Sequence, residues 1–436
     1  MTKHSLSIPI IRGLAIAAIG IAGAAGAAIG GVHAQTTTIC VSPNPSPACV
    51  TSIQQAVDNA SPGATITLNG GTYHQSVTIT KPLTLQGSNA ANTIIDATGQ
   101  ANAIRIEGTT GPVRIANITA ENAIDMGILV ANASQVTIDS NIIMHNDRGW
   151  APIPGATPEQ LASGQGSTCP NVTLFLQGDC GEGMNLNGVT NSVVSNNQVH
   201  DNIGGILLSD ENGPTHGNQI VNNMVMNNDD ECGITLASHP GGAPPNFTPA
   251  GGVYNNEVEG NTVTGNGAAG IGIYTPIPGT AAYANIVRNN IAQNNGLPGV
   301  ALHSHAPGQN LNDNVIIGNT LSGNGPDGGV NTDPTGIVIF SDLSAGAMPI
   351  TGTVIDGNQI TGETTGIYIG TAAINQSAHN NSITVSGMGI DNQGAGMVDA
   401  SSNFWGCAGG PGSAGCSGTS GTVMTAPPLA SAVAMP

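Results

Sequence analysis

Carboxylate and imidazole side chains recur in this sequence at fixed offsets from a repeated glycine. Glu211, His239 and His305 each lie six residues after a glycine that begins a short aliphatic segment, and His303 lies four residues after one. A carboxylate and an imidazole within hydrogen-bonding distance can serve as general acid and base. The alternative for each histidine is a solvated surface residue. The candidate catalytic set is Asp210, Glu211, His239, His303, His305 and Asp342.

A second group of carboxylates lies just before the repeated glycine. Asp179, Asp201 and Asp229 each precede it by four residues, and Asp230 follows directly. Stacked carboxylates repel one another unless they are protonated or bridged by a cation, and Ca²⁺ prefers oxygen ligands. We therefore expect a calcium site at Asp179, Asp201, Asp229 and Asp230. An acid and nucleophile pair, or a set of solvated corner residues, remains the alternative for the same side chains.

The elements that must position these residues are short strands in a repeat. A glycine followed by alternating aliphatic residues, as in 205–208 and 336–339, recurs every 22 to 37 residues, and segments that begin with asparagine, such as Asn223 and Asn261, lie between the copies. This alternation predicts strands, with glycine and asparagine at the corners. One unit cannot bury its own apolar face, so the units must stack. The sequence therefore predicts an all-β, single-stranded parallel β-helix with rungs about 4.8 Å apart and a buried asparagine ladder at one corner.

The segments 51–57, 63–73 and 77–87 resemble the opening coils of right-handed parallel β-helix proteins of the pectin-lyase-like and NosD-like superfamily. Residues 403–406, Asn-Phe-Trp-Gly, resemble a motif near the C-terminus of such proteins. The resemblance covers about residues 50–417 and implies a right-handed solenoid with a short N-terminal capping helix in 51–60. It implies no single activity, because the family includes lyases, hydrolases, epimerases, metallocentre accessory proteins and phage adhesins.

Three functions are compatible with this resemblance. A polysaccharide hydrolase or lyase acting in an outward-facing groove is favoured by the acid and histidine stripe. The alternatives are a non-catalytic cell-envelope adhesin or glycan-binding β-helix, and a NosD-like metallocentre accessory protein. The motifs of polygalacturonase-like enzymes are matched only at Asp229-Asp230. The sequence leaves open whether the protein is an enzyme.

Aromatic and cationic side chains near these columns are the candidate substrate-binding residues: Trp150, Tyr274, Phe340 and Arg148. Trp150 lies in an insertion at 149–180 that we expect to form a lid, a sugar-stacking platform or a decoration. After residue 34 the cations are few, and they are Lys81, Arg105, Arg114, Arg148 and Arg288. This scarcity disfavours a polyanionic substrate unless Ca²⁺ bridges it, and it favours hydrolysis of a neutral glycan.

Charge and composition exclude other classes of partner. The chain has 7 Lys and Arg against 26 Asp and Glu, for a formal net charge of −19. No basic patch can form, which argues against binding to nucleic acid or to anionic membranes. Only 8% of the residues are charged and 3% are aromatic, whereas 63 are glycine. Such a composition predicts a core of small residues. Polysaccharide or a cell-envelope glycan is the expected partner.

The first 34 residues have the form of a bacterial-type export signal, with Lys3 and Arg12 before an Ala/Ile/Gly run and a small-x-small site at 32–34. We expect cleavage there rather than a membrane anchor, and a secreted, periplasmic or cell-surface protein. Three close cysteine pairs predict disulfides in such a compartment: Cys40 with Cys49, Cys169 with Cys180, and Cys407 with Cys416. The expected organisation is a signal at 1–34, an extension at 35–50, the β-helix at 51–417 and a disordered tail at 418–436.

Overall fold

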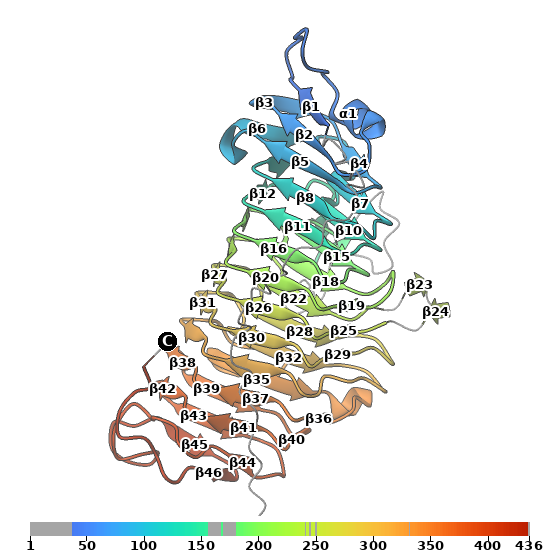
Figure 1. The fold of residues 1–436 in the computed structure, drawn as a ribbon. Helices are drawn as coiled ribbons and strands as arrows, with labels where there is room; N and C mark the ends of the chain where they lie inside the picture. The colour runs from blue at the N-terminus through green and yellow to red at the C-terminus, as the bar shows by residue number, and fades with distance from the viewer. Residues whose placement is uncertain are drawn as a thin grey trace, which may run out of the picture. The chain divides into compact units, whose positions relative to one another are not determined.

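The computed structural model describes residues 37–155, 167–168, 180–239, 241–243, 246–248, 251–330 and 332–434. Over these residues the chain forms a right-handed parallel β-helix in which three long parallel sheets are stacked coil by coil (Figure 1). The fold class expected from the repeat is therefore confirmed. The proposed signal at 1–34 lies outside the described residues and stays a prediction.

Most coils contribute one strand to each of three sheets. The 14-stranded sheet contains β1 (Thr38–Val41), β2 (Ala64–Leu68), β5 (Leu83–Gly87), β8 (Val113–Ala116), β11 (Val136–Asp139), β16 (Val193–Ser195), β20 (Gln219–Val221), β26 (Glu257–Glu259), β30 (Ile286–Arg288), β33 (Val315–Ile317), β37 (Val354–Asp356), β41 (Ser377–His379), β44 (Val398–Asp399) and β46 (Val423–Met424). The 11-stranded sheet contains β3 (Gly71–His74), β6 (Thr93–Asp96), β9 (Thr119–Glu121), β12 (Ile142–Met144), β17 (Gln198–His200), β21 (Met224–Met226), β27 (Thr262–Thr264), β31 (Ile291–Gln293), β34 (Thr320–Ser322), β38 (Gln359–Thr361) and β42 (Ser382–Thr384). The 12-stranded sheet contains β4 (Val77–Ile79), β7 (Asn102–Glu107), β10 (Met126–Ala131), β15 (Glu182–Asn187), β18 (Gly204–Ser209), β22 (Ile234–Ala237), β28 (Ile271–Thr275), β32 (Val300–Ser304), β35 (Thr335–Ser341), β39 (Thr365–Ile369), β43 (Met388–Asn392) and β45 (Gly418–Ser420).

Short strands at the corners and in the insertions form four small sheets. A three-stranded parallel sheet contains β19 (Thr215–His216), β25 (Val253–Tyr254) and β29 (Ala282–Tyr283). The two-stranded sheets pair β13 (Ala151–Pro152) with β14 (Ser167–Thr168), β23 (Gly241–Ala243) with β24 (Asn246–Thr248), and β36 (Ile350–Thr351) with β40 (Ala373–Ile374). The β13–β14 pair lies within the predicted insertion at 149–180.

The strand register places the aliphatic residues of the repeat inside the coils. On the 12-stranded sheet one aligned inward column is fully buried and consists of Ile206, Ile234, Ile271, Val300 and Ile337. Because successive side chains of a strand point to opposite faces, the residues between them point outward. The outward column therefore contains Tyr274, His303 and Phe340 in register, as the sequence predicts.

Buried asparagines form ladders at the corners of the coils. In the longest ladder each side-chain Nδ2 donates to the Oδ1 of the next asparagine at 2.9–3.0 Å, through Asn141, Asn197, Asn223, Asn261, Asn290, Asn319, Asn358, Asn381 and Asn403. This is the ladder that the sequence predicts. Two further ladders run through the other corners, one from Asn146 to Glu363 and one from Asn218 to Asn314.

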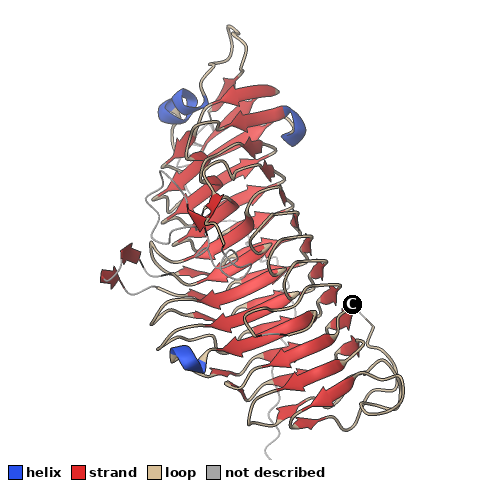
Figure 2. Ribbon diagram, turned by 180° about the vertical axis from the view of Figure 1, so that it is seen from behind, coloured by secondary structure: helices blue, strands red, loops and turns tan. Residues whose placement is uncertain are grey.

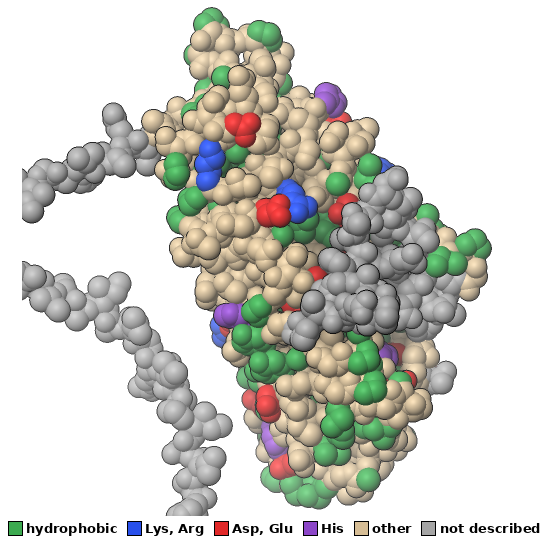
Figure 3. All heavy atoms as spheres, turned by 90° about the vertical axis from the view of Figure 1, so that its right-hand side faces the viewer, with side chains coloured by type: hydrophobic (Ala, Val, Ile, Leu, Met, Phe, Trp, Pro, Cys, Tyr) green, Lys and Arg blue, Asp and Glu red, His purple; other side chains and the backbone are tan. Residues whose placement is uncertain are grey.

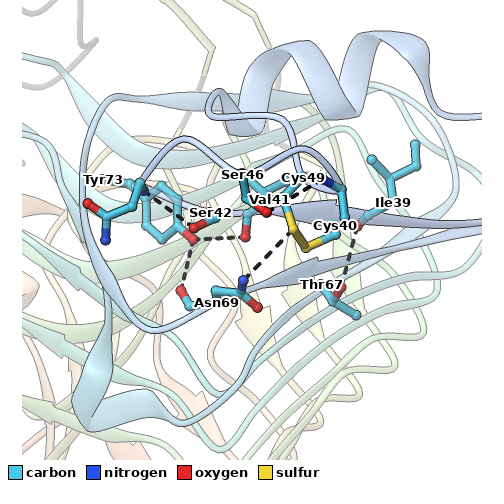
Figure 4. The surroundings of a disulfide bond; sticks show 11 residues. Ile39, Cys40, Val41, Ser42, Ser46, Cys49, Thr67, Asn69 and Tyr73 are labelled. Carbon is cyan, nitrogen blue, oxygen red and sulfur yellow. Dashed lines mark hydrogen bonds between the residues drawn. A yellow bond between two sulfur atoms is a disulfide. The ribbon is translucent and has the colours of Figure 1, made fainter.

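The N-terminal end of the solenoid is closed by a short helix, as expected. Helix α1 (Ile53–Asn59) begins at Ser52, whose side chain accepts a hydrogen bond from the backbone N–H of Gln55, and its buried face lies against the first coil (Figures 1 and 2). The preceding extension also belongs to the fold, because β1 pairs with β2. Figure 4 shows the Cys40–Cys49 disulfide beside β1 and the Tyr73 hydroxyl, which donates to the carbonyls of Val41 and Asn69.

The C-terminal segment corrects the prediction of a disordered tail at 418–436. Strand β45 pairs with β43, and β46 pairs with β44, so the solenoid continues beyond residue 417. Further on, the Leu429 N–H donates to the Asn403 carbonyl and the Val433 N–H donates to the Ser382 hydroxyl. The Ala, Pro and Ser content suggested disorder, but parallel pairing is made by backbone groups and does not require apolar side chains.

Two of the predicted disulfides, Cys40–Cys49 and Cys407–Cys416, are present. Cys180 is also disulfide-bonded, whereas Cys169 lies outside the described residues. Disulfides are typical of extracellular and other oxidising compartments. In the part of the chain that the structure describes, no helix has the length and apolar character needed to cross a membrane.

Candidate functional site

The most concentrated chemistry on the 12-stranded sheet is a group that we call the imidazole cluster, formed by Tyr274, His303, His305, Asp327 and Phe340. Strands β28, β32 and β35 supply the rings, which point outward from three successive rungs. Asp327 comes from the loop between β34 and β35, at the corner where the chain enters the 12-stranded sheet. The cluster thus joins a strand column to one insertion loop.

His303 lies at the centre of the cluster and contacts both of its polar neighbours. Its Nε2 is 2.7 Å from the Asp327 carboxylate, and its Nδ1 is 3.3 Å from Nε2 of His305. The His303 and Asp327 side chains are only 8% and 5% exposed, whereas His305 is half-buried. The three side chains form a chain of contacts that runs from a buried carboxylate to a solvent-accessible ring, an arrangement able to move a proton.

The pKa values of Asp327 and His305, at the two ends of the cluster, are both shifted downward. Burial acts to raise the pKa of Asp327, but His303 and the backbone N–H groups of Gly329 and Val330 outweigh it, so this pKa lies below its ordinary value. Burial, reinforced by the charge of His303, lowers the pKa of His305 to about 4. At neutral pH the cluster therefore holds an ionised Asp327 and an uncharged His305.

Aromatic rings surround the two imidazoles. The His303 ring meets Tyr274 and Phe340 edge-on, with centroids 5.7 and 5.4 Å apart, and His305 meets Phe340 at 6.1 Å. The Tyr274 ring lies over Gly272, where an added Cβ would come 2.1 Å from a ring carbon. The Tyr274 hydroxyl approaches the buried Cys232 sulfur at 3.6 Å. The predicted binding residues Tyr274 and Phe340 thus lie against the predicted catalytic histidines.

Cys232 is a buried free thiol, 2% exposed, beside this aromatic group. Burial raises the pKa of Cys232 to about 11, so the thiolate needed for nucleophilic reactivity is disfavoured. Burial also raises the pKa of Tyr274 well above its ordinary value. Both groups are therefore neutral at physiological pH.

Glu211 and His239 form a second, separate pair. Glu211 Oε1 is 2.9 Å from His239 Nδ1, and each side chain is 7% exposed. The contact expected from the repeat is therefore present. The pair lies two rungs from His305 through β22, β28 and β32, a separation of about 10 Å. It is not part of the imidazole cluster.

Asp210 and Asp342 have structural contacts. Asp210 is buried and accepts hydrogen bonds from the Ser238 hydroxyl and from the backbone N–H groups of His239 and Gly252. Burial raises the pKa of Asp210 to about 6 despite these bonds. Asp342 caps the short helix η2 (Leu343–Ala345), and the hydrogen bond from the Ser344 hydroxyl is the main cause of its lowered pKa. Their assignment as catalytic residues stays a prediction.

Two of the predicted binding residues lie away from the imidazole cluster. Arg148 contacts Asp147 and Asn122, at the corner that precedes β15. Trp150 follows in the same corner, with its backbone N–H bonded to the Asp147 carbonyl. Four rungs, about 19 Å, separate β15 from β32. Trp150 and Arg148 therefore cannot contact a ligand at His303 directly unless that ligand spans these rungs.

The predicted column of carboxylates is wrong in its register. Asp201 is aligned with Asn227, because its N–H bonds to the Asn227 carbonyl, whereas the Asp229 N–H bonds to the Asn202 carbonyl. The corner between the ladder asparagine and the repeated glycine contains two residues after Asn202 but four after Asn228, so counting back from the glycine misaligns the two coils. Asp179 lies outside the described residues.

The other acids of the predicted column, Asp229 and Asp230, both have raised pKa values. Burial raises the pKa of Asp229, and the charges of Asp147 and Asp201 raise it further. Burial and then the Asp229 charge raise the pKa of Asp230. Among the described residues, no group of three or more His, Cys, Asp or Glu side chains is arranged to hold a metal ion. Calcium at Asp201, Asp229 and Asp230 stays a prediction.

Sequence reasoning missed Asp327 and a row of stacked rings. The signal for Asp327 was the 37-residue interval between Gly299 and Gly336, which marks an insertion. The rings belong to the three-stranded sheet, where His216 stacks on Tyr254 at 4.8 Å and Tyr254 stacks on Tyr283 at 5.1 Å. Each ring lies two residues before an asparagine of the Asn218–Asn314 ladder, and this spacing in the sequence could have revealed the row of rings.

The fold places the chain in a recognised class. Residues 63–244 and 250–345 match the family described as right handed beta helix region, and the chain belongs to that family. No curated protein sequence matches it.

Solved structures with the same fold are similar at low sequence identity. The catalytic domain of a GH87 α-1,3-glucanase in complex with tetrasaccharides is 15% identical over 89% of this chain and 68% of its own, with a TM-score of 0.61. A mannuronic acid specific polysaccharide family 6 lyase from human gut microbiota is 16% identical over 89% and 83%, with a TM-score of 0.55. A mannuronan C-5 epimerase A-module from Azotobacter vinelandii is 16% identical over 86% and 94%, with a TM-score of 0.51. At these identities the likeness concerns the fold.

Proposed function

We propose that this chain is a secreted polysaccharide-active protein whose imidazole cluster performs acid–base chemistry on a neutral glycan. The observation that carries the proposal is the contact of His303 with Asp327 on one side and His305 on the other. Asp327 orients the His303 ring, and His303 in turn contacts the half-buried His305, which can meet a substrate. The proposal is supported by the activities named for proteins of similar fold, a glucanase, a lyase and an epimerase.

The charge distribution supports a neutral substrate. Each of the five Lys and Arg side chains after residue 34 is already engaged, either with backbone carbonyls, as Lys81 is, or with acids, as Arg105, Arg114, Arg148 and Arg288 are. Figure 3 shows the few blue Lys and Arg atoms of one face as isolated spots. A uronate polymer would bring one carboxylate per residue to a protein of net charge −19. Neutral sugars avoid this repulsion, so hydrolysis is proposed rather than elimination.

Part of the proposal concerns the compartment. The two described disulfides suit an oxidising environment. The basic and apolar segment at 1–34 supplies an export signal. Secretion is tested by expressing the full chain in a bacterium and sequencing the N-terminus of the protein recovered outside the cytoplasm. Cleavage after residue 34 supports the proposal, and an intact cytoplasmic chain contradicts it.

The activity is tested on a panel of neutral glucans and mannans alongside alginate and pectin. New reducing ends report hydrolysis, and ultraviolet absorbance of unsaturated ends reports elimination. We expect reducing ends from a neutral glycan and a loss of about 10²–10⁴-fold in kcat for His305→Ala, since general acid–base catalysis contributes that much. The matched control is His379→Ala, on the 14-stranded sheet, which should keep full activity. Equal activity of wild type and His305→Ala would overturn the proposed site, and binding of a glycan without any product would indicate a glycan-binding protein instead.

A further inference from the structure

The two histidines of the imidazole cluster approach each other through ring nitrogens rather than through ring faces. His303 Nδ1 and His305 Nε2 are 3.3 Å apart, and the ring planes are tilted by 49°. His303 lies in β32 and His305 directly follows its last residue, so the two residues are alternate along the chain and both side chains leave the sheet on the same face. The contact is a hydrogen bond between the rings, and a metal ion bound to both nitrogens would take the place of the shared proton.

The distance between the nitrogens suits a tetrahedral metal. Two imidazole nitrogens that bind one Zn²⁺ at about 2.0–2.1 Å with tetrahedral geometry lie about 3.3–3.4 Å apart. The observed 3.3 Å agrees with that spacing. The same spacing can therefore hold a hydrogen-bonding proton or a metal ion.

The contact on the far side of His303 fixes the nitrogen that faces His305. Nε2 of His303 lies 2.7 Å from Asp327 Oδ2, so an ionised Asp327 favours the tautomer that carries its proton on Nε2 and its free lone pair on Nδ1. A carboxylate beside the second nitrogen of a histidine is the usual outer partner of a metal-binding imidazole. Asp327 is itself held by backbone N–H groups in its loop.

We propose that His303 Nδ1 and His305 Nε2 bind a borderline divalent transition-metal ion such as Zn²⁺, with solvent completing the coordination. Imidazole nitrogen suits Zn²⁺, Cu²⁺ and Ni²⁺, whereas Ca²⁺ takes oxygen ligands. The ion replaces the proton shared by the two rings. This inference rests on the geometry of the cluster and holds whether or not the chain acts on a polysaccharide.

The coexistence of both roles has a consequence for activity. If the cluster is the acid–base centre proposed above, Zn²⁺ occupies the nitrogens that must carry the proton and therefore inhibits the reaction. Zn²⁺ would then act as a reversible inhibitor that competes with protonation.

The test is calorimetric titration of metal-free protein with ZnCl₂ alone, without any glycan. We expect one Zn²⁺ per chain in the wild type and at least a 10-fold weaker affinity for His305→Ala. Asp327→Asn should weaken binding about 10- to 100-fold, the usual effect of losing the outer partner of a ligating histidine. His379→Ala serves as the control, because His379 also lies near a carboxylate, that of Asp399, and should leave the affinity unchanged.

Co²⁺ provides a second readout that does not depend on heat. Tetrahedral Co²⁺ gives intense visible absorption, which should appear in the wild type and be lost in His305→Ala, where the replaced side chain is half-buried. Identical Zn²⁺ isotherms for wild type and His305→Ala would overturn the inference. If the protein binds Zn²⁺ but converts no glycan, only the proposed function is contradicted. If the protein converts a glycan but neither binds Zn²⁺ nor is inhibited by it, only the metal site is contradicted.

Discussion

Two polar columns run along the same solenoid, and they differ in how their members are held. In the corner ladder that contains Asn261 every rung repeats the same side chain and the same pair of hydrogen bonds. In the imidazole cluster neighbouring rungs carry different rings, and the closest partner of His303 comes from a loop. Both columns lie perpendicular to the strands, at rungs about 4.8 Å apart.

The comparison separates architecture from chemistry. A residue type that recurs at every coil can be satisfied by its own copies, so its role is to hold the stack together. A group whose partners change from coil to coil does not serve the stack, since no neighbouring rung reproduces its contacts. Departures from the repeat, rather than the repeat itself, therefore mark the candidate site.

The largest expected effect is on the ladder. Asn261→Leu would remove the acceptor for the backbone N–H and Nδ2 of Asn223, and it would remove the donor to the Ile220 carbonyl. Each buried polar group left without a partner costs about 1–3 kcal/mol. We expect a loss of at least about 3 kcal/mol in the free energy of unfolding, measured by urea denaturation.

Gln198→Leu is the matched control, because it also converts an amide to leucine but on the exposed face of β17. A change within about 0.5 kcal/mol is expected there. If Asn261→Leu and Gln198→Leu lose the same stability, the asparagine ladder does not hold the stack together.

The second effect concerns Asp210, a buried carboxylate outside the ladders. Its folded pKa of about 6 lies above the ordinary 3.8, so the folded protein binds the proton more tightly than the unfolded chain. Stability therefore falls as pH rises from about 4 to about 6, by about 3 kcal/mol from this group alone. Asp210→Asn lacks this loss of stability. The free energy of unfolding of the variant minus that of wild type should therefore rise by the same amount from pH 4 to pH 7.

Urea denaturation of both proteins across that range measures the difference. Carboxylates with lowered pKa, such as Asp139 and Asp327, contribute the opposite slope in both proteins and cancel in the comparison. Parallel curves for wild type and Asp210→Asn would show that Asp210 does not titrate in this range.

The ladders also explain how much the sequence could predict. Repeated glycines set the rung register on the 12-stranded sheet, so the contact of Glu211 with His239 follows from counting. Counting failed at Asp201 and Asp229, because the corner between the ladder and the next strand varies in length. Asparagines that bond one another fix the register better than glycines that begin strands.

Asp327 could not be found by counting at all. It lies in a loop whose path is set by its own hydrogen bonds: the Asp327 N–H donates to the Thr332 hydroxyl, and the Gly329 N–H donates to the Asp327 carboxylate. An insertion of this kind has no periodic neighbour, so sequence spacing carries no information on which rung it reaches. The central contact of the candidate site was therefore beyond the repeat pattern.

A third, smaller effect probes the aromatic side of the cluster. Gly272→Ala would place a Cβ 2.1 Å from the Tyr274 ring and must displace it. Overpacking of this kind costs about 1–3 kcal/mol, and we expect a similar loss of stability together with several-fold weaker glycan binding. Gly396→Ala is the control, because an added Cβ there meets no atom within 4 Å. Unchanged glycan affinity in Gly272→Ala would remove Tyr274 from the binding surface.

The smallest effect is expected where a ladder ends in an acid. Glu363 Oε1 accepts from the backbone N–H and Nδ2 of Asn324, in the place where other rungs carry asparagine. Burial raises the pKa of Glu363, so its ionised form is disfavoured in the folded protein and costs stability at high pH. Glu363→Gln keeps the acceptor and cannot ionise. We expect a gain below about 1 kcal/mol at pH 8 that vanishes at pH 4, where both side chains are neutral. A loss at pH 8 would mean that the charge itself is needed, and Glu363 would then belong with the chemistry rather than with the ladder.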